Sequence, residues 1–377
     1  MGVFSFGKAS SSIGLDIETN TFRVVQLRPS SDKPVLLNYG SIKVPVGAVI
    51  EGEIVDVDMA AQTLAQLWKK TGLSEKKVAI GIANQKVVVR LIPFPLMDKK
   101  ELRSAIKYQA QDFIPIPIEE AILDFDIVGE FTNEENERMM EVLLVAAQRD
   151  MVENNIAALN KAGLKPQVID VSSFALVRVL VDKPSILPEE NGEEAVALVD
   201  IASGITNIVV VERGTPRFTR VASLAGNNFT QRIADAMNVS FDEAEELKVK
   251  VGLPVPKNEK EEVKEEAPPV EPEKVKVVQD ILLKEINKFI GEVRRSIDYY
   301  LTQRPGVKSI KRVILSGNGA KMKNLALHLE KGLQVQADFG HPLQKVKIGP
   351  KLSQDLLASE ELAIAISLGL GLRGLEE

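Results

Sequence analysis

The sequence predicts a two-lobed α/β protein, and three observations lead to that fold class. The chain has 377 residues, which is more than one ordinary hydrophobic core accommodates, so two or more packed units of roughly 100 to 200 residues are expected. Short apolar segments of strand length alternate with amphipathic segments of helix length. One strand–turn–strand pattern occurs twice, at residues 13–25 and 197–209, which indicates that both lobes begin with the same hairpin.

The composition is that of a globular protein and excludes several classes of site. Hydrophobic residues make up 45% of the chain and charged residues 27%. Because the chain has no cysteine and only two histidines, His328 and His341, we expect no disulfide, thiol nucleophile or histidine-based metal site. The net charge of -6 argues against a nucleic-acid-binding protein. No apolar stretch has the length of a signal peptide or a membrane span, so we expect a cytosolic protein.

Strands and helices alternate through the first half of the chain. Strands are expected at residues 13–18, 22–28, 78–83, 87–92, 123–128 and 141–147. A first helix at 59–70 is expected to begin with Asp58 as its cap and to end at Gly72. A second helix is expected to begin at Asp98 and to carry Phe113 on its apolar side. A third is expected to begin with Asp150 as its cap.

The pattern changes near residue 165 and then starts again. A strand at 167–171 leads into an apolar helix at 173–181, and a connector containing Pro and Glu, 183–194, is expected to form the boundary between the lobes. Helices are expected at 227–237 and 241–251. Residues 254–276 contain five prolines and few large apolar residues, which predicts an exposed loop. One long amphipathic helix follows, with apolar side chains recurring from Leu282 to Tyr300.

The repeated hairpin is the most informative feature of the sequence. The two copies align without gaps, so that Asp16 corresponds to Asp200, Thr19 to Ser203 and Asn20 to Gly204. A tight turn of small polar residues directs backbone N–H groups into one concavity that can hold phosphate oxygens. The carboxylate at the end of each first strand could face a hydrated Mg²⁺ from opposite sides. An isolated aspartate in a hairpin usually only forms the turn, but two in matching positions favour a shared site.

A third segment fits the same cleft between the lobes. Residues 312–322 form a buried strand that runs into a turn containing Gly317 and Gly319, where a flat ligand could approach the backbone closely. Strands followed by such glycine turns occur in many folds, so the segment carries weight only through its place in the second lobe.

In these three segments the chain resembles the actin, Hsp70 and sugar-kinase superfamily. Residues 13–27 resemble its phosphate-1 motif, 197–211 its phosphate-2 motif and 313–325 its adenosine motif, and the segments 173–181 and 362–372 resemble its two connecting helices. Within the superfamily, residues 91–97 (LIPFPLM), 106–115 (IKYQAQDFIP), 145–150 (VAAQRD) and 162–170 (AGLKPQVID) are similar to the PilM family of type IV pilus assembly proteins rather than to the FtsA family.

The resemblance implies an actin-like, ribonuclease H-like fold with an FtsA-type 1C subdomain inserted in the first lobe. The implied boundaries are 1–85 and 166–194 for subdomain 1A, 86–165 for 1C, 195–224 and 306–350 for 2A, 225–305 for 2B with the loop 254–276, and 351–377 for a C-terminal connecting helix that returns to 1A.

The resemblance also implies ATP with Mg²⁺ in the cleft between the lobes. Asp16 and Asp200 would face the metal and the phosphates, and Arg23 would replace the lysine that contacts phosphate in relatives. Glu245 and Lys248 would approach the nucleoside. The implied nucleotide-binding residues are Asp16, Thr19, Asn20, Thr21, Arg23, Asp200, Ser203, Gly204, Ile205, Thr206, Gly226, Glu245, Lys248, Gly317, Asn318 and Gly319.

The chain departs from the superfamily at four positions where relatives usually carry glycine: Glu18, Ala202, Ala225 and Asn318. Glu18 adds negative charge beside the expected phosphates, which should reduce affinity for ATP. The sequence also offers no clear general base. We therefore expect a scaffold that binds nucleotide and hydrolyses it slowly or not at all, and no catalytic residue is assigned.

The PilM resemblance implies a partner and a location. The partner is the short cytoplasmic N-terminal segment of a PilN-like inner-membrane protein, received in a groove on 1A and 1C. Other pilus platform proteins and assembly ATPases are further implied partners, in a type IV pilus or a related type II secretion machinery. The protein would lie at the inner face of the bacterial inner membrane and associate with the membrane only through its partners.

Other functions of the same fold are weighed on features of the sequence. An FtsA-type division protein should end in a linker and a membrane-seeking amphipathic helix, whereas this sequence ends directly after the last expected connecting helix. A sugar kinase needs a catalytic aspartate over a substrate hydroxyl, and none stands out. An Hsp70-like chaperone needs a separate peptide-binding domain after the second lobe. The scaffold function is therefore preferred.

Overall fold

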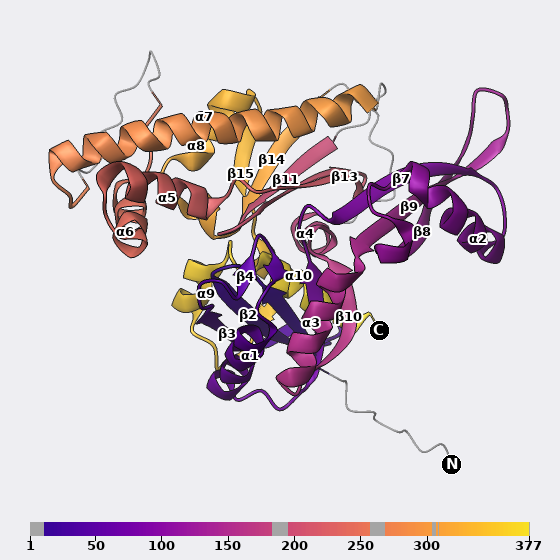
Figure 1. The fold of residues 1–377 in the computed structure, drawn as a ribbon, viewed down its shortest axis with the longest axis horizontal. Helices are drawn as coiled ribbons and strands as arrows, with labels where there is room; N and C mark the ends of the chain where they lie inside the picture. Colours follow the sequence, from indigo (N-terminus) through magenta and orange to yellow (C-terminus); the bar gives the residue numbers. More distant parts are fainter. Residues whose placement is uncertain (1–10, 183–194, 257–267, 304–306, 308, 377) are drawn as a thin grey trace.

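A computed structural model describes residues 11–182, 195–256, 268–303, 307 and 309–376. The described chain forms two lobes, each built on one large mixed sheet, and a small domain built on a three-stranded sheet (Figure 1). The first lobe holds the early strands together with the last helices, and the second lobe holds the strands after residue 194. The small domain projects from the side of the molecule where its strand β7 approaches β13 of the second lobe.

The first lobe is a six-stranded sheet with strand order β10-β6-β1-β2-β3-β16. Its antiparallel hairpin β1–β2 lies beside the parallel strands β6 and β10. The strands are β1 (Ser12–Ile17), β2 (Thr21–Arg28), β3 (Val35–Lys43), β6 (Lys77–Ile82), β10 (Lys165–Val171) and β16 (Lys347–Ile348). The helices α1 (Val57–Thr71) and α3 (Arg149–Lys161) pack in one apolar core against this sheet.

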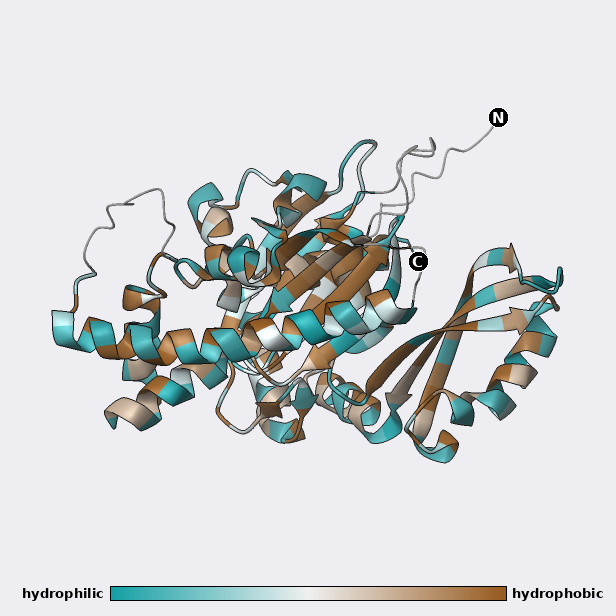
Figure 2. Ribbon diagram, turned by 90° about the horizontal axis from the view of Figure 1, so that it is seen from above, coloured by the Kyte–Doolittle hydropathy of each residue, from teal (hydrophilic) through white to brown (hydrophobic). Residues whose placement is uncertain are grey.

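The second lobe is a five-stranded sheet with strand order β13-β12-β11-β14-β15. Its strands are β11 (Ala195–Ile201), β12 (Thr206–Glu212), β13 (Thr215–Ala222), β14 (Ile310–Ser316) and β15 (Gln336–Phe339). Its helices are α5 (Gly226–Met237), α6 (Phe241–Val251), α7 (Pro272–Gln303) and α8 (Leu325–Leu333). Apolar side chains along α7 pack in the core of this lobe, which explains the predicted amphipathic pattern. Figure 2 shows apolar and polar residues alternating along the helix.

The small domain consists of β7 (Val87–Pro95), β8 (Ala121–Thr132), β9 (Arg138–Gln148) and the helix α2 (Lys99–Gln109). The strand order is β7-β9-β8, and α2 covers one face through Leu102 and Ile106. Arg217 on β13 forms an ion pair with Glu141 on β9, so the small domain is also tied to the second lobe. Shorter elements are β4 (Val49–Ile50), β5 (Glu53–Ile54), α9 (Gln354–Glu360) and the 3-10 helices η1 (Ala110–Asp112), η2 (Ile118–Glu120), η3 (Asn318–Lys321) and η4 (Pro342–Lys345).

Two helices lie between the lobes and join them. The helices α4 (Ser172–Leu180) and α10 (Ala365–Leu375) contribute to a core cluster that contains Val25 and Leu27 of the first sheet and Leu198 and Val209 of the second. Both lobes therefore bury apolar surface against the same helix pair.

The two predicted hairpins have the same register. Asp16 on β1 lies opposite Arg23 on β2, and Asp200 on β11 lies opposite Asn207 on β12. The ungapped alignment of the repeat therefore describes equivalent positions in the two sheets.

Several details of the predicted elements are wrong. The cap of α1 is Asp56, which accepts a hydrogen bond from Met59 N at 2.9 Å, because the helix begins two residues earlier than expected. Asp150 lies inside the first turn of α3, and the residue before that helix is Gln148. Phe113 lies beyond α2 and is 39% exposed.

The structure tests only part of the two expected connecting segments, 254–276 and 183–194. The expected loop 254–276 is wrong at its end, because α7 already begins at Pro272, a favourable first residue of a helix. The middle of that loop, 257–267, and the connector 183–194 lie outside the described residues.

The strand β3 was not predicted, because the polar residues Asn38 and Ser41 and Gly40 interrupt its alternation.

The contact between β1 and α10 yields a first prediction. A side-chain Cβ at Gly14 would lie 2.0 Å from Ser367 O and 2.3 Å from Gly371 N, which are backbone atoms of α10. We expect Gly14→Ala to lower the free energy of unfolding by about 3 kcal/mol or more, because the helix must move away from the sheet. Urea denaturation followed by Trp68 fluorescence measures the change.

Gly129→Ala is the matched control, because Gly129 also lies in a strand. The nearest atom to its added Cβ would be Glu141 Oε2 at 3.8 Å, an ordinary contact distance. We expect this variant to change stability by less than about 1 kcal/mol. Equal stabilities of the two variants would show that α10 does not lie against β1 as described.

Candidate functional site

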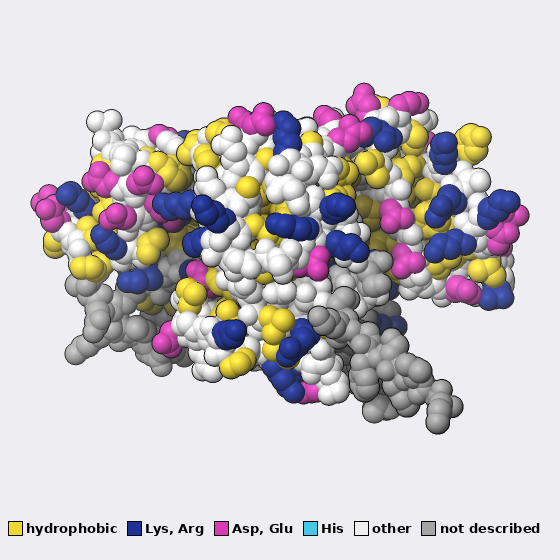
Figure 3. Space-filling model, turned by 90° about the horizontal axis from the view of Figure 1, so that it is seen from below, with side chains coloured by type: hydrophobic (Ala, Val, Ile, Leu, Met, Phe, Trp, Pro, Cys, Tyr) yellow, Lys and Arg dark blue, Asp and Glu magenta, His cyan; other side chains and the backbone are white. Residues whose placement is uncertain are grey.

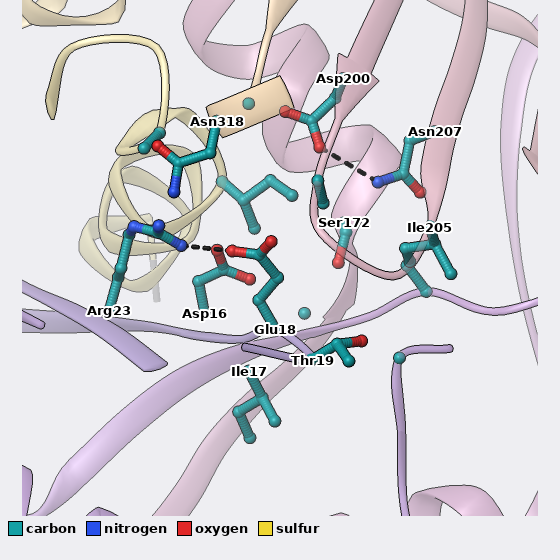
Figure 4. Close-up of a pocket in the computed structure, with 17 residues that line it drawn as sticks. Asp16, Ile17, Glu18, Thr19, Arg23, Ser172, Asp200, Ile205, Asn207 and Asn318 are labelled. Atoms are coloured by element: carbon teal, nitrogen blue, oxygen red, sulfur yellow. Dashed lines mark hydrogen bonds and ion pairs between the residues drawn. The ribbon is translucent and has the colours of Figure 1, made fainter. Parts of the chain in front are cut away.

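The turns of the two repeated hairpins meet at a small cavity between the lobes (Figure 4). The cavity has a volume of about 30 Å³, which is room for water but far less than a small-molecule site usually has. Its lining comes from both hairpins, from the ends of β6 and β14, and from α4 and α10. The lining residues are Asp16, Ile17, Glu18, Thr19, Arg23, Gly52, Gly81, Ala83, Ser172, Asp200, Ala202, Ile205, Asn207, Gly317, Asn318, Ala363 and Ile366.

The two repeated aspartates are both buried at this cavity. Asp200 accepts hydrogen bonds from Ser316 Oγ at 2.8 Å and from Asn207 Nδ2 at 3.3 Å. Burial raises the pKa of Asp200 to about 6, although these two hydrogen bonds act in the opposite direction. Burial also raises the pKa of Asp16 well above its usual value, and the negative charge of Glu18 adds to that shift. The cavity therefore holds carboxyl groups that resist ionisation.

Glu18 joins the two lobes at the cavity. Its Oε2 forms an ion pair with Arg23 Nη1 in the same hairpin (Figure 4). Its Oε1 accepts a hydrogen bond from the backbone N–H of Ser203, at 2.5 Å, in the turn of the other hairpin. Glu18 and Arg23 are 8% and 2% exposed, so this is a buried charge pair with few competing water contacts.

Arg23 has a second carboxylate nearby. Its Nε lies 3.8 Å from Glu360 Oε2, and Tyr39 donates a hydrogen bond of 2.8 Å to the same oxygen. Burial disfavours the charged guanidinium, but Glu18 and Asp16 outweigh that effect and raise the pKa of Arg23. Burial and the charge of Glu360 likewise raise the pKa of Tyr39. Arg23 is therefore a permanent cation at the edge of the cavity.

Three further contacts close the interface between the hairpin turns. The amides of Asn20 and Asn227 exchange two hydrogen bonds, of 2.8 and 3.1 Å, across the lobes. Thr19 lies against Gly204, where an added Cβ would be 2.2 Å from Thr19 Oγ1. Ala83 of the first lobe packs on Ala202 and Ile205 of the second. The lobes thus contact each other directly on the side where the turns meet.

The glycine turn after β14 lies at the same cavity. Gly317 has a φ of +84°, and an added Cβ would be 2.3 Å from Ile201 O, so only glycine fits there. Its N–H donates to Leu362 O at 2.8 Å. Asn318 also lines the cavity, whereas Gly319 packs against Ile201.

The structure separates the predicted site residues into two groups. Those that line the cavity are Asp16, Thr19, Arg23, Asp200, Ile205, Gly317 and Asn318. The others lie near the turns or on α5 and α6, outside the lining; they are Asn20, Thr21, Ser203, Gly204, Thr206, Gly226, Glu245, Lys248 and Gly319.

Three residues of the second group have polar contacts within the second lobe. Lys248 is paired with Glu245 at 2.7 Å and donates to Thr230 Oγ1 at 2.8 Å. Thr206 donates through Oγ1 to Leu224 O at 2.8 Å. These groups support the second lobe in the closed arrangement, and their role toward a nucleoside stays a prediction.

Sequence reasoning missed several lining residues. Asn207 could have been found, because it occupies the position of Arg23 in the repeat. Ser172 begins α4 directly after a strand, with no motif to mark it. The sequence marks Glu18 only as a departure from glycine. No pattern in the sequence indicates that its side chain contacts Ser203 of the other lobe.

The closed cavity does not fit a nucleotide. Small-molecule sites usually have about 300 to 1,000 Å³, far more than this cavity offers. Within the described ranges, no group of three or more His, Asp or Glu side chains is arranged to hold a metal ion. Three buried polar atoms of the cavity lining, Thr19 Oγ1, Arg23 Nε and Asn207 Oδ1, lack hydrogen-bond partners in the structure. The chemistry of the lining therefore suits an anion, but the space in this arrangement does not.

Comparison with solved structures shows the fold. A chain of the "PilM-PilN type IV pilus biogenesis complex" has a TM-score of 0.79 and 26% identity, over 98% of this chain and 100% of that chain. The structure of "MreB5 of Spiroplasma citri bound to ADP" has a TM-score of 0.50 and 13% identity, over 97% and 96% of the two chains. The predicted actin-like α/β fold is confirmed.

Comparison of sequences identifies a matching family model and curated relatives. A family model described as "Type IV pilus assembly protein PilM" matches residues 14–375. The cell division protein FtsA of Escherichia coli strain K12 is 30% identical over 217 residues, which are 54% of this chain and 49% of that protein. The chain spans about half the length of the first curated relatives that it matches. Among the helices of the described residues, none combines the length and the apolar character that a membrane span requires.

The raised pKa of Asp200 yields a second prediction. An unfolded aspartate has a pKa near 4, so between about pH 4 and pH 6 the folded protein binds more protons than the unfolded chain. The stabilising contribution of the protonated side chain is complete below pH 4 and is lost as the pH rises through 6. Relative to Asp200→Asn, the wild type should lose about 2 kcal/mol of stability between pH 4 and pH 7.5.

Urea denaturation at a series of pH values, in buffer containing a chelator, measures this difference. Asparagine suits the site, because Asn207 can turn its amide and use its Oδ1, which has no partner in the structure, as an acceptor. Parallel pH profiles of the two proteins would contradict the raised pKa.

Proposed function

Because this chain belongs to the type IV pilus assembly protein PilM family, we propose that it is an actin-like scaffold of a pilus assembly machinery. Its partner in this proposal is the cytoplasmic N-terminal segment of a PilN-like inner-membrane protein. The observation that carries the proposal is the likeness to the PilM-PilN complex over nearly the whole of both chains. The protein would lie at the inner face of the inner membrane, held there by its partners, and the same scaffold could serve a type II secretion machinery.

The proposed partner site is the groove between the first lobe and the small domain. Val171 of β10, Val89 and Leu143 form an apolar cluster there, with Val128 and Phe174 packed at its margin. Figure 3 shows hydrophobic side chains in the hollow between these two parts of the molecule.

The strand β10 borders this groove in a way that suits an extended peptide. It lies at one end of the six-stranded sheet, so one of its edges has no neighbouring strand among the described residues. Ile169, two residues before Val171, projects from the same face and is 37% exposed. An extended segment could pair with this edge and bury Ile169.

The cleft between the lobes is the proposed site for ATP with Mg²⁺. The turns supply backbone N–H groups, Arg23 supplies a permanent charge, and Asp16 and Asp200 supply oxygen atoms for a hydrated metal. Glu245 and Lys248 would lie toward the nucleoside. Because the described cavity is too small, entry requires the lobes to part. We propose a binding role with at most slow hydrolysis, since no residue of the cavity is placed as a general base for water.

A membrane-tethering division protein of the FtsA type is the second candidate, because several curated relatives are FtsA proteins. The family model and the likeness to a PilM-PilN complex favour the pilus scaffold. Flotation with liposomes, in the absence of other proteins, separates the two. Recruitment by bare liposomes would favour the division function.

The groove yields a third prediction. We expect the purified protein to bind a synthetic peptide with the N-terminal sequence of the PilN protein from the same organism, as measured by calorimetry. Ile169→Asp should weaken the affinity at least about tenfold, because the substitution removes buried apolar area and adds a charge to be desolvated.

Ile50→Asp is the matched control, because Ile50 lies in the first lobe on β4 and is 53% exposed. Its affinity for the peptide should equal that of the wild type. If wild-type protein does not bind the peptide, the proposed partner is wrong. If the wild type and both variants bind equally well, the partner stands and the groove is the wrong site.

A further inference from the structure

Glu18 occupies a position between the lobes that has the properties of an anion site. The carboxylate lies between the guanidinium of Arg23 and the backbone N–H of Ser203, one group from each hairpin. A permanent cation beside a turn N–H is the arrangement that proteins use to bind a phosphate or carboxylate group. We call the space between these two groups the anion position. In this structure a side chain of the protein itself fills it.

The filled anion position coincides with direct contact between the lobes. Asn20 pairs with Asn227, and Thr19 lies against Gly204, in the two residues that follow Glu18. The remaining cavity is about 30 Å³. Protein groups from both lobes thus contact each other at the turns.

The surroundings of Glu18 also work against it. Asp16 and Asp200 lie close enough for the charge of Glu18 to raise the pKa of both. Two attractive partners therefore hold the carboxylate in place, and ionisation of either aspartate would repel it. Such a balance suits an internal group that an anion with its own counterion, such as a metal-bound phosphate, could displace.

We propose that Glu18 is an internal substitute for a phosphate group, which closes the two lobes on each other and which a phosphate-bearing ligand must displace before it can bind. The inference rests on the proposed role of the cleft as a nucleotide site and adds its regulation. Two consequences follow. The lobes close without nucleotide, and the apparent affinity for nucleotide is reduced by the fraction of molecules in which Glu18 fills the anion position.

In the first experiment the Glu18 carboxylate is removed by mutation, and a free anion is added to take its place. In Glu18→Ala, Arg23 keeps its charge but loses its buried partner, so the melting temperature should fall by about 5 °C or more. Inorganic phosphate should restore part of that loss, compared with sodium chloride at the same ionic strength. The wild type should respond less, because its anion position is filled.

Glu285→Ala is the matched control for this experiment. Glu285 is also a buried carboxylate, is paired with Lys288 at 2.7 Å, and lies on α7 away from the cavity. Its loss also removes a buried carboxylate from an ion pair, but the partner Lys288 is 59% exposed and no anion position between the lobes results. General stabilisation of proteins by phosphate would raise all melting temperatures alike. Equal responses of Glu18→Ala, Glu285→Ala and the wild type would overturn the proposal.

The second experiment measures nucleotide binding by calorimetry with Mg-ADP and Mg-ATP. Glu18→Ala should bind at least about tenfold more tightly than the wild type, because the competing carboxylate is gone. Glu18→Gln keeps the size of the side chain and should lie between the two, and it serves if the alanine variant does not fold. Equal affinities in wild type and variants would overturn the proposal.

The third experiment measures lobe closure without any ligand. The chain has no native cysteine, so spin labels can be attached at Lys69→Cys on α1 and Ala236→Cys on α5, two exposed positions in different lobes. The ligand-free protein should give one narrow distance distribution, and adding Glu18→Ala or Glu18→Gln should broaden it. Identical distributions would show that Glu18 does not hold the lobes closed.

The PilN peptide serves as a separate readout in all variants. Loss of peptide binding by the wild type would count against the proposed partner and leave the anion experiments unaffected. Unchanged closure and nucleotide affinity in the Glu18 variants would count against this inference, with peptide binding intact.

Discussion

The close packing of α10 against β1 and α4 is the constraint on which the rest of this structure depends. Gly14 lets the helix backbone approach the central strand of the first lobe, and Gly369 lets it approach Ala175 of α4. The same helix pair buries side chains from the second sheet. The starts of the two hairpins are therefore brought to a common axis, and their turns meet. Without that approach, Asp16 and Asp200 would belong to separate surfaces.

The cavity that results is dominated by the balance of charge rather than by apolar packing. One permanent cation, Arg23, lies among Glu18, Asp16 and Glu360, with Asp200 across the cavity. Burial makes each uncompensated charge costly, so the carboxyl groups that Arg23 does not pair have raised pKa values. The arrangement favours anions that bring their own counterion, which is the chemistry of a metal-bound phosphate.

The sequence predicted the parts of this arrangement that depend on local pattern or on the repeat. The hairpins, the positions of Asp16 and Asp200 and the glycine turn at Gly317 follow from alternation and alignment, and the actin-like fold follows from their order. Features that depend on how the lobes contact each other could not be predicted from the sequence. The hydrogen bond from Ser203 to Glu18 joins residues of different lobes, and the closed cavity follows from it. Errors at helix starts, such as Asp58 for Asp56, arose because two acidic residues lie within one turn.

The ion pair between Arg217 and Glu141 links the small domain to the second lobe through side chains. The chain itself joins the small domain only to the first lobe, at β6 and α3. The small domain is therefore fastened at two places, by the backbone to the first lobe and by side chains to the second. A displacement of the small domain would act on both lobes at once.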